Sequence, residues 1–379
     1  DRNGIKFNRP DGEIDKSDEL GIKEAVVTMP LDLFESNGSL THPFTLPPIH
    51  IKVEEKYQKR WVDFFGSQAL ANLKIGVYQH STVGRDSLVE IFSALGAEVT
   101  PLARSETFIP VDTEAIRPED VTLAQQWCAN GEFDALVSAD GDCDRPLLST
   151  ENGEWIRGDV LGVLCAQYLQ ADGVATPVSC NSCLEKSESF TGIARTKIGS
   201  PFVIAGMAEL AQQGYQAVVG YEANGGFLQW SDITMEGKTL EALPTRDPVI
   251  ACVGALLLAR QQNLTLGELL KSLPARYTAS DRLQEFPTEL AREYIGKMSH
   301  QDIVQDSIAF EKEFGALALE VRSIDYTDGT RFTLSNQDVV HLRPSGNAPE
   351  LRCYTESSSP AAALALNQDC LEIMATWRQ

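Results

Sequence analysis

The chain has 379 residues, 43% of them hydrophobic, which is enough for two to four domains with cores of their own. Its net charge of −22 at pH 7 argues against nucleic acid as a partner. No long apolar run and no signal peptide are present, and the eight cysteines form no compact disulfide framework, so a cytoplasmic protein without membrane association is expected.

The first fifty residues are expected to hold little regular structure. A short strand is predicted at residues 5–7 and one helix at residues 17–29, capped by Asp15 or Ser17. Residues 35–50 are rich in Gly, Ser, Thr and Pro, which is typical of a linker.

Strands and helices then alternate over residues 73–261. The strands are expected at residues 73–78, 98–102, 134–138, 176–180 and 216–219, and the helices at 84–95, 121–130, 158–169, 206–213 and 247–261. Such alternation predicts two α/β units whose parallel sheets carry helices on their faces. Ligands of such sheets bind beyond the carboxyl ends of the strands.

The C-terminal part has a different order of elements. Two helices come first, then three consecutive strands, then one more strand and a closing helix, at residues 288–297, 301–314, 316–326, 331–334, 339–342, 351–354 and 360–377. Consecutive strands followed by a helix predict an α+β unit with an antiparallel sheet.

The strand at 134–138 leads into an acidic loop, Asp-Gly-Asp-Cys-Asp-Arg at residues 140–145. Asp140, Asp142 and Asp144 repel one another unless a cation lies between them, and their hard oxygen ligands suit Mg²⁺ or Ca²⁺. Arg145 follows at once and indicates an anion in the same site. A cation beside an anion-binding arginine is typical of phosphoryl transfer.

Two other interpretations of the acidic loop remain open from its residues alone. An EF-hand calcium loop would use the three aspartates as its first ligands, but Arg145 stands where the sharp turn needs Gly, and a strand precedes the loop. A solvated acidic turn without a ligand is compatible with an acidic chain. The position of the loop at the carboxyl end of a predicted strand favours a bound ligand over a solvated turn.

Two further loops carry polar chemistry. Residues 343–352, Arg-Pro-Ser-Gly-Asn-Ala-Pro-Glu-Leu-Arg, offer a guanidinium, a hydroxyl, an amide and backbone N–H groups around Gly346, which suits a phosphate; a plain hairpin loop is the alternative. Residues 220–226, Gly-Tyr-Glu-Ala-Asn-Gly-Gly, follow a strand. There Glu222 and Asn224 suit sugar hydroxyls, and a glycine-rich turn is the alternative.

Together and in this order, the three loops resemble those of the α-D-phosphohexomutase superfamily. The acidic loop matches that family's DGDxDR metal loop at every position, and the last loop matches its RPSGTEP phosphate loop, with Asn347 for Thr and Ala348 for Glu. The middle loop matches the GExSGH sugar loop more loosely, with Glu222 kept, Asn224 for Ser and Gly226 for His. Several motifs spread along one chain are far more specific than any one of them.

The resemblance implies a multidomain α/β fold around a central site. Residues 1–50 would be the remnant of a first α/β domain plus a linker, and 51–152 a second α/β domain that ends in the metal loop. Residues 153–265 would be a third α/β domain with the sugar loop, also with a mostly parallel sheet. Residues 266–379 would be a C-terminal α+β phosphate-binding domain.

The resemblance also implies Mg²⁺-dependent phosphoryl transfer between C1 and C6 of a hexose phosphate, by way of a phosphoserine and a bisphosphate that reorients. One Mg²⁺ ion would be held by Asp140, Asp142 and Asp144, and Lys6 and Arg145 would stabilise charge or transfer protons. The substrate would be bound by Lys197, Glu222, Asn224, Arg246, Arg343, Ser345, Gly346 and Asn347. Hexose phosphates and bisphosphates are the expected partners, of a monomer or a homodimer.

One departure from the family pattern concerns the sugar pocket. Where relatives often carry Asp-Gly near a helix start, this chain has Thr245-Arg246-Asp247. The pocket has therefore lost the histidine at Gly226 and gained a guanidinium, which predicts an unusual sugar preference. Arg246 would pair with Glu222 or with an anionic group of the ligand; the alternative is a solvated residue near a helix start.

The other departure is that no serine of residues 1–50 has the setting of the family's TASHNP phosphoserine loop. Residues 3–6 match the segment that follows this loop in the family, so we expect the loop to lie upstream and the chain alone to lack mutase turnover. The alternative function is a non-catalytic protein that binds sugar phosphates. A haloacid-dehalogenase-type phosphatase is disfavoured because Arg145 stands where its DxDxT loop needs Thr.

Overall fold

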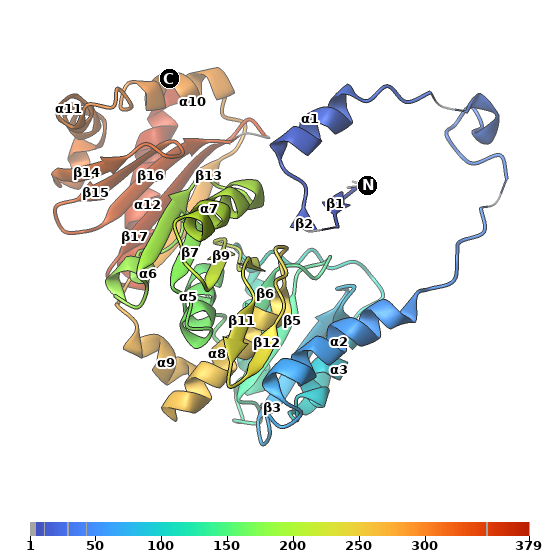
Figure 1. Ribbon diagram of the computed structural model, residues 1–379. Helices are drawn as coiled ribbons and strands as arrows, with labels where there is room; N and C mark the ends of the chain where they lie inside the picture. Colours follow the sequence, from blue (N-terminus) through green and yellow to red (C-terminus); the bar gives the residue numbers. More distant parts are fainter. Residues whose placement is uncertain (1–4, 11, 29, 43, 346–347, 379) are drawn as a thin grey trace.

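The computed structural model describes residues 5–10, 12–28, 30–42, 44–345 and 348–378. The fold is mixed α/β, as expected, with three larger sheets arranged one after another along the body of the molecule (Figure 1). The boundaries of the four predicted domains stay predictions.

The first sheet has the strand order β4-β3-β5-β6. Its strands are β3 (Lys74–His80), β4 (Glu98–Arg104), β5 (Ala135–Ala139) and β6 (Pro146–Leu148), and its helices are α2 (Ile51–Phe65), α3 (Arg85–Ala94) and α4 (Pro118–Cys128). Strand β3 pairs in parallel with β4 and β5, while β6 returns antiparallel along β5. All five residues of β5 are buried, which is typical of a central parallel strand. The acidic loop is the tight connection between β5 and β6.

The second sheet repeats this arrangement, with the order β10-β9-β7-β8. Its elements are α5 (Gly158–Tyr168), β7 (Gly173–Pro177), α6 (Cys183–Lys186), β8 (Gly192–Thr196), α7 (Ser200–Gln212), β9 (Val218–Tyr221), β10 (Phe227–Gln229) and α8 (Pro248–Gln262), with a small hairpin of β11 (Ile233–Met235) and β12 (Lys238–Leu240). Strand β10 returns antiparallel along β9, so the loop at residues 220–226 connects these two strands as the acidic loop connects β5 and β6. We call it the sugar loop after the family motif that it resembles.

A close approach fixes the sugar loop against helix α5. A Cβ atom on Gly158, the first residue of α5, would lie 2.1 Å from the backbone nitrogen of Gly225. Gly225 itself has a φ of +89°, a conformation that favours glycine. Both glycines are therefore required for this loop to lie on the N-terminus of the helix.

The two α/β sheets share one hydrophobic core, which runs from Trp61 to Leu269. Helices α5 and α8 lie between the sheets, and most residues of α8 are buried. Within the described residues, no single helix is long and apolar enough to cross a membrane; α8 and α9 (Leu266–Ser272) meet the test of length and composition only together, with a bend of 82°.

The C-terminal unit is a five-stranded antiparallel sheet in the order β13-β17-β16-β15-β14, with a core of its own. Its elements are β13 (Tyr277–Leu283), α10 (Thr288–Gly296), α11 (Ile303–Phe314), β14 (Val321–Asp325), β15 (Thr330–Leu334), β16 (Val339–Pro344), β17 (Leu351–Ser357) and α12 (Pro360–Ala375). The loop at 343–352 joins β16 to β17, in the predicted antiparallel arrangement.

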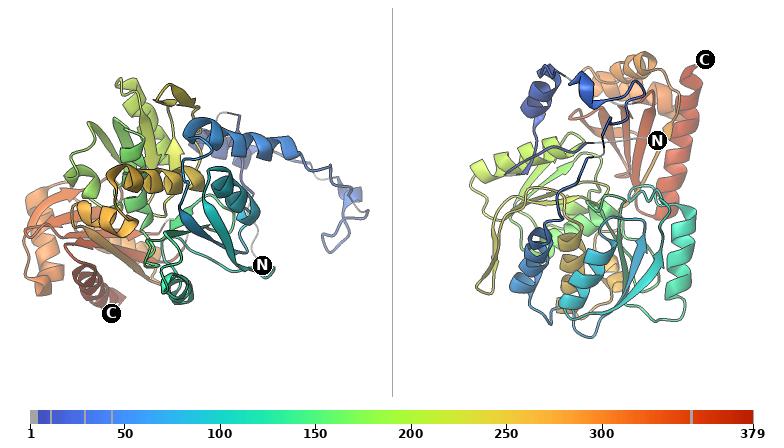
Figure 2. Two further views of the ribbon diagram at one scale, coloured as in Figure 1. Left: turned by 90° about the horizontal axis from the view of Figure 1, so that it is seen from below. Right: turned by 90° about the vertical axis from the view of Figure 1, so that its right-hand side faces the viewer.

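The N-terminal segment differs most from the prediction. The expected strand at residues 5–7 was wrong: a short pair is formed instead by β1 (Asn8–Arg9) and β2 (Gly12–Glu13). Asp15 caps helix α1, which spans Lys16–Glu24 and ends before the β-branched residues that follow. Before α2 the chain traces a wide arc beside the rest of the molecule (Figure 1), and the left view of Figure 2 shows this arc projecting from the body.

Candidate active site

The acidic loop is organised around Asp140, which is buried at the end of β5. Its Oδ1 accepts the backbone N–H groups of Asp144 and Arg145, at 3.0 and 3.2 Å. Ligand oxygens of Asp140, Asp142 and Asp144 all lie within 4.8 Å of one another. Burial, and then the charges of Asp144 and Asp142, raise the pKa of Asp140 to about 6. Negative charge is therefore crowded here, and a cation would relieve it.

The structure brings both predicted catalytic cations to this loop. The Lys6 ammonium binds the carboxylate of Asp142, and that of Asp144 at 2.5 Å. Burial acts to raise the pKa of Asp142, but the hydrogen bond and the charge of Lys6 outweigh it and lower that pKa. Arg145 lies 3.7 Å from Asp144 and 3.9 Å from Asp140, and its buried Nε has no hydrogen-bond partner. Lys6 thus shows that a positive charge fits between these carboxylates.

Arg246 connects the acidic loop to the loop at residues 220–226. Its guanidinium lies 3.1 Å from Asp144 Oδ2, 3.9 Å from Glu222 Oε2 and 3.2 Å from Glu13 Oε1. Its side chain is only 14% exposed, so these charges are largely withdrawn from water. The expected pairing of Arg246 with Glu222 is present, and the alternative of a solvated residue near a helix start does not fit this burial.

Glu222 is the buried carboxylate of the sugar loop. Burial raises its pKa to about 7, against the opposing charges of Arg246 and Arg145. Its Oε2 is buried and has no hydrogen-bond partner. A buried acceptor without a partner is costly unless a ligand satisfies it, and sugar hydroxyls have the required donors.

The other two sugar-loop positions have different roles. The side-chain oxygen of Asn224 accepts the N–H of Gly226 at 3.0 Å and so shapes the loop itself. A Cβ atom on Gly226 would lie 2.7 Å from Cδ of Arg246. Arg246 therefore fills the space that a side chain at position 226 would enter.

Among the remaining predicted residues that the structure describes, Arg343 and Ser345 lie at the β16–β17 loop. Arg343 Nε lies 2.9 Å from Oδ2 of Asp328, which also accepts the N–H of Ile198 at 3.0 Å. Asp328 therefore connects Arg343 to the segment between β8 and α7. The exposed Lys197 belongs to this segment, directly before Ile198. Ser345 is buried, and its N–H donates to Glu350 O at 2.9 Å. Gly346 and Asn347 lie outside the described residues.

Three residues of the site were not predicted from the sequence. Glu13 also accepts the hydroxyl of Ser200, at 2.6 Å, and so ties the N-terminal strand pair to α7 and to Arg246. Asp328 orients Arg343, as described above. Arg352 lies directly opposite Arg343 in the β16–β17 register, and its place within the 343–352 motif could have revealed it. No comparable sequence motif surrounds Glu13 or Asp328.

Comparison with known proteins shows the family to which this chain belongs. The family model of the phosphoglucomutase/phosphomannomutase α/β/α domain III matches residues 157–277, and the family model of the C-terminal domain matches residues 289–373. A phosphomannomutase from Salmonella muenchen is 44% identical over 361 residues, which cover 95% of this chain and 71% of that protein. The chain belongs to the phosphoglucomutase/phosphomannomutase family. A phosphomannomutase from Sinorhizobium fredii is 39% identical over 96% of this chain and 74% of its own length. These relatives support a phosphohexomutase, an enzyme of the isomerase class.

Solved structures share the fold of this chain. A phosphoglucomutase/phosphomannomutase family protein from Burkholderia thailandensis superposes with a TM-score of 0.64 at 19% identity, over 86% of this chain and 65% of its own. N-acetylphosphoglucosamine mutase from Aspergillus fumigatus, in complex with GlcNAc-6P and magnesium, gives 0.58 at 14% identity, over 85% of this chain and 70% of its own.

Proposed function

We propose that this protein is a Mg²⁺-dependent phosphohexomutase that moves a phosphoryl group between C1 and C6 of a hexose phosphate, through a phosphoserine and a bisphosphate. The observation that carries the proposal is the double contact of Arg246, 3.1 Å from Asp144 and 3.9 Å from Glu222. This contact supports a single site that combines groups suited to phosphoryl transfer with groups suited to sugar binding.

Asp140, Asp142 and Asp144 would hold one Mg²⁺ ion. The fit rests on the crowding of three carboxylates within 4.8 Å and on Asp144 Oδ1, which is buried without a hydrogen-bond partner. Hard oxygen donors at this density are the ligands that Mg²⁺ prefers. When bound, the ion would neutralise charge that develops on the transferred phosphoryl group.

Lys6 and Arg145 would act at the same phosphoryl group. Both cations already lie against the acidic loop, and Arg145 has an unused donor in its Nε. Positive groups fixed in advance around the transferring oxygens stabilise the transition state without reorganisation during the reaction. Glu222, whose pKa burial raises to about 7, can donate or accept a hydrogen bond at neutral pH and suits a sugar hydroxyl.

The non-reacting phosphate would be bound at the β16–β17 loop, by Arg343, Ser345, Gly346 and Asn347, with Lys197 alongside. Arg352 joins this set because its Cα lies opposite that of Arg343 in the sheet register. Two guanidiniums side by side match the oxygen geometry of a phosphate. The Aspergillus fumigatus relatives in complex with GlcNAc-6P and with glucose 1,6-bisphosphate support sugar phosphates as the ligand class.

The test is a panel of hexose 1-phosphates, those of glucose, mannose and glucosamine, supplied to the full-length protein with Mg²⁺ and a trace of hexose 1,6-bisphosphate. Formation of the 6-phosphate from at least one sugar, abolished by a chelator and restored by Mg²⁺, is the expected result. Binding of these sugar phosphates without any turnover would instead indicate a non-catalytic binding protein.

A further inference from the structure

Three arginines form a row across the C-terminal sheet. Arg352 of β17 pairs in register with Arg282 of β13 on one side and with Arg343 of β16 on the other. The side chains of residues in direct register project from the same face of a sheet, and neighbouring strands are about 4.8 Å apart. The row therefore extends from the proposed phosphate loop to β13, which is the edge strand.

Like charges directly opposite one another destabilise a sheet, so this row needs compensation. Arg282 and Arg352 share the carboxylate of Glu350, each at 3.2 Å, while Arg343 is held by Asp328. Arg352 Nε is still buried without a hydrogen-bond partner. The phosphate site as proposed above accounts for Arg343 and Arg352, but not for Arg282.

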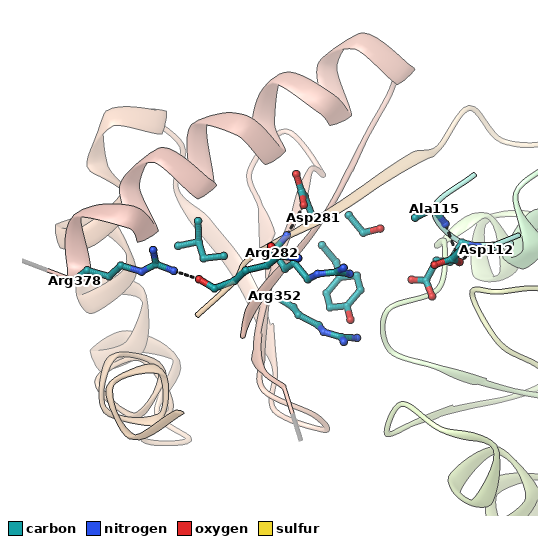
Figure 3. Close-up of a pocket in the computed structure, with 11 residues that line it drawn as sticks. Asp112, Ala115, Asp281, Arg282, Arg352 and Arg378 are labelled. Atoms are coloured by element: carbon teal, nitrogen blue, oxygen red, sulfur yellow. Dashed lines mark hydrogen bonds between the residues drawn. The ribbon is translucent and has the colours of Figure 1, made fainter. Parts of the chain in front are cut away.

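A cavity of about 600 Å³ lies at the Arg282 end of the row. Arg282, Arg352 and Tyr354 line the side formed by the sheet, and Figure 3 shows the loop of Asp112 and Ala115 on the other side of the gap. The volume is in the range of small-molecule sites. The next residue of this loop after Asp112, Thr113, donates its hydroxyl to Asn224 O at 2.7 Å, so the wall opposite the arginines is fixed to the sugar loop.

The chemistry of the two walls defines the ligand class. The arginines suit a phosphate, and the carboxylates of Asp112 and Glu114 suit the hydroxyl groups of a sugar. One oxygen of Asp112 already accepts the N–H groups of Glu114 and Ala115, at 2.9 and 3.1 Å, and burial raises the pKa of Glu114. These contacts hold the Asp112 carboxylate within its own loop, on the side of the cavity opposite the arginines.

We propose that Arg282 and this cavity form a second phosphate position, next to that of Arg343, for the hexose bisphosphate intermediate. The inference rests on the proposed function, in which the bisphosphate must exchange its two ends between the phosphoryl transfers. A phosphate held at Arg282 keeps the intermediate on the protein while its other end leaves the metal loop. No covalent step is involved.

The test is Arg282→Gln in the full-length protein, with Arg322→Gln as the matched control, because Arg322 is an exposed arginine on β14 at the opposite edge of the same sheet. Loss of a charge-assisted hydrogen bond should raise the concentration of glucose 1,6-bisphosphate needed for half-maximal turnover by about tenfold. The kcat at saturating bisphosphate should stay near that of the wild type. Arg282→Lys should restore part of the loss, and the control should behave as the wild type.

The inference would be overturned if turnover depended on bisphosphate concentration equally in Arg282→Gln and Arg322→Gln. It would also be overturned if Arg282→Gln lowered Tm and kcat but left the bisphosphate dependence unchanged, because Arg282 would then be only a structural partner of Glu350. Direct titration with glucose 1,6-bisphosphate separates this outcome from failure of the proposed function. A wild type without turnover refutes the proposed function. Weaker binding by Arg282→Gln than by the control would still support the site, and equal binding would refute it.

Discussion

Asp142 is the exposed member of the three acidic-loop carboxylates, so it offers the clearest test of the proposed metal site. The substitution Asp142→Asn keeps the size of the side chain but removes one charged ligand. Mutation of a residue that only orients a metal ligand typically lowers metal affinity or activity by about 10–100-fold. Loss of a charged ligand should therefore lower turnover by at least about 100-fold. The measurement is the initial rate as a function of Mg²⁺ concentration.

Asp369, exposed on α12, provides the control for this experiment, because Asp369→Asn removes the same charge far from the loop. The control should keep the rate and the Mg²⁺ dependence of the wild type. Full activity of Asp142→Asn at limiting Mg²⁺ would show that this carboxylate is not a ligand.

Arg246 makes the sugar preference testable. Removing its guanidinium by Arg246→Ala leaves Glu13, Asp144 and Glu222 without their shared cation, and truncation of a buried charge partner is costly. We expect kcat/KM to fall at least about tenfold and the ranking of glucose, mannose and glucosamine 1-phosphates to change. Arg246→Lys should recover only part of the activity, because an ammonium cannot reach three carboxylates as the guanidinium does.

Arg292→Gln, an exposed arginine on α10, is the matched control for loss of one positive charge. The specificity role of Arg246 would be refuted if Arg246→Ala lowered the rates of all three sugars by one common factor.

Single residues were predictable where their chemistry is concentrated in sequence. The three aspartates and Arg145 follow a buried strand directly, so their grouping is local and could be recognised. Glu13 lies far in sequence from Ser200 and Arg246, and Asp328 meets Arg343 only because β15 and β16 pair. An isolated acidic residue in the sequence resembles any surface carboxylate. Their roles depend on tertiary contacts, with Arg246 and Arg343, that no local pattern encodes.

At the scale of elements, β16 supports the proposed phosphate loop through a buried histidine. His341 Nε2 contacts Asp328 O at 2.6 Å, and Asp328 in turn holds Arg343 and the N–H of Ile198. Burial, and the charges of Arg331 and Arg343, lower the pKa of His341 to about 4. The side chain is therefore neutral at pH 7 and donates its Nε2–H to the carbonyl oxygen.

The depressed pKa of His341 predicts a loss of stability in acid. An unfolded histidine titrates near 6.5, so between pH 6.5 and 4 the unfolded chain binds more protons than the folded one. The free energy of unfolding therefore falls as the pH falls through this window, by up to roughly 1.4 kcal/mol per pH unit from this group. In His341→Gln this part of the pH dependence should disappear, which thermal unfolding across the window would measure.

His50, exposed before α2, serves as the control, and His50→Gln should keep the pH dependence of the wild type. Parallel curves of Tm against pH for His341→Gln and wild type would contradict the assignment.

Elements with strong periodicity were predictable, and short ones were not. The strand that became β5 is apolar except for Ser138, and the helix that became α8 begins at a recognisable Asp-Pro cap. Strand β13 was missed because its sequence, Tyr-Thr-Ala-Ser-Asp-Arg-Leu, lacks the β-branched and apolar alternation of a typical strand; it is formed by pairing with β17 along its whole length. Strands β6 and β10 are only three residues long and depend on the strands along which they return.

On the scale of the whole molecule, a polar joint connects the shared α/β core to the separate C-terminal core. Glu356 of β17 is buried and accepts the hydroxyl and the N–H of Ser182, which lies just before α6. It also binds Arg276 Nε, at 2.5 Å, in the segment that leads into β13. One carboxylate thus joins the second sheet, the connecting segment and the C-terminal sheet.

This joint predicts how the molecule unfolds. Glu356→Gln removes the negative charge that pairs with the buried guanidinium of Arg276. Removing one partner of a buried ion pair destabilises a protein by about 3–5 kcal/mol. Because the two cores are separate, this loss should uncouple them, and calorimetry should resolve an earlier transition for the C-terminal unit. Glu372→Gln, an exposed position on α12 of the same unit, should keep the wild-type thermogram. Superimposable thermograms for Glu356→Gln and the wild type would mean that the hydrophobic contacts alone couple the two parts.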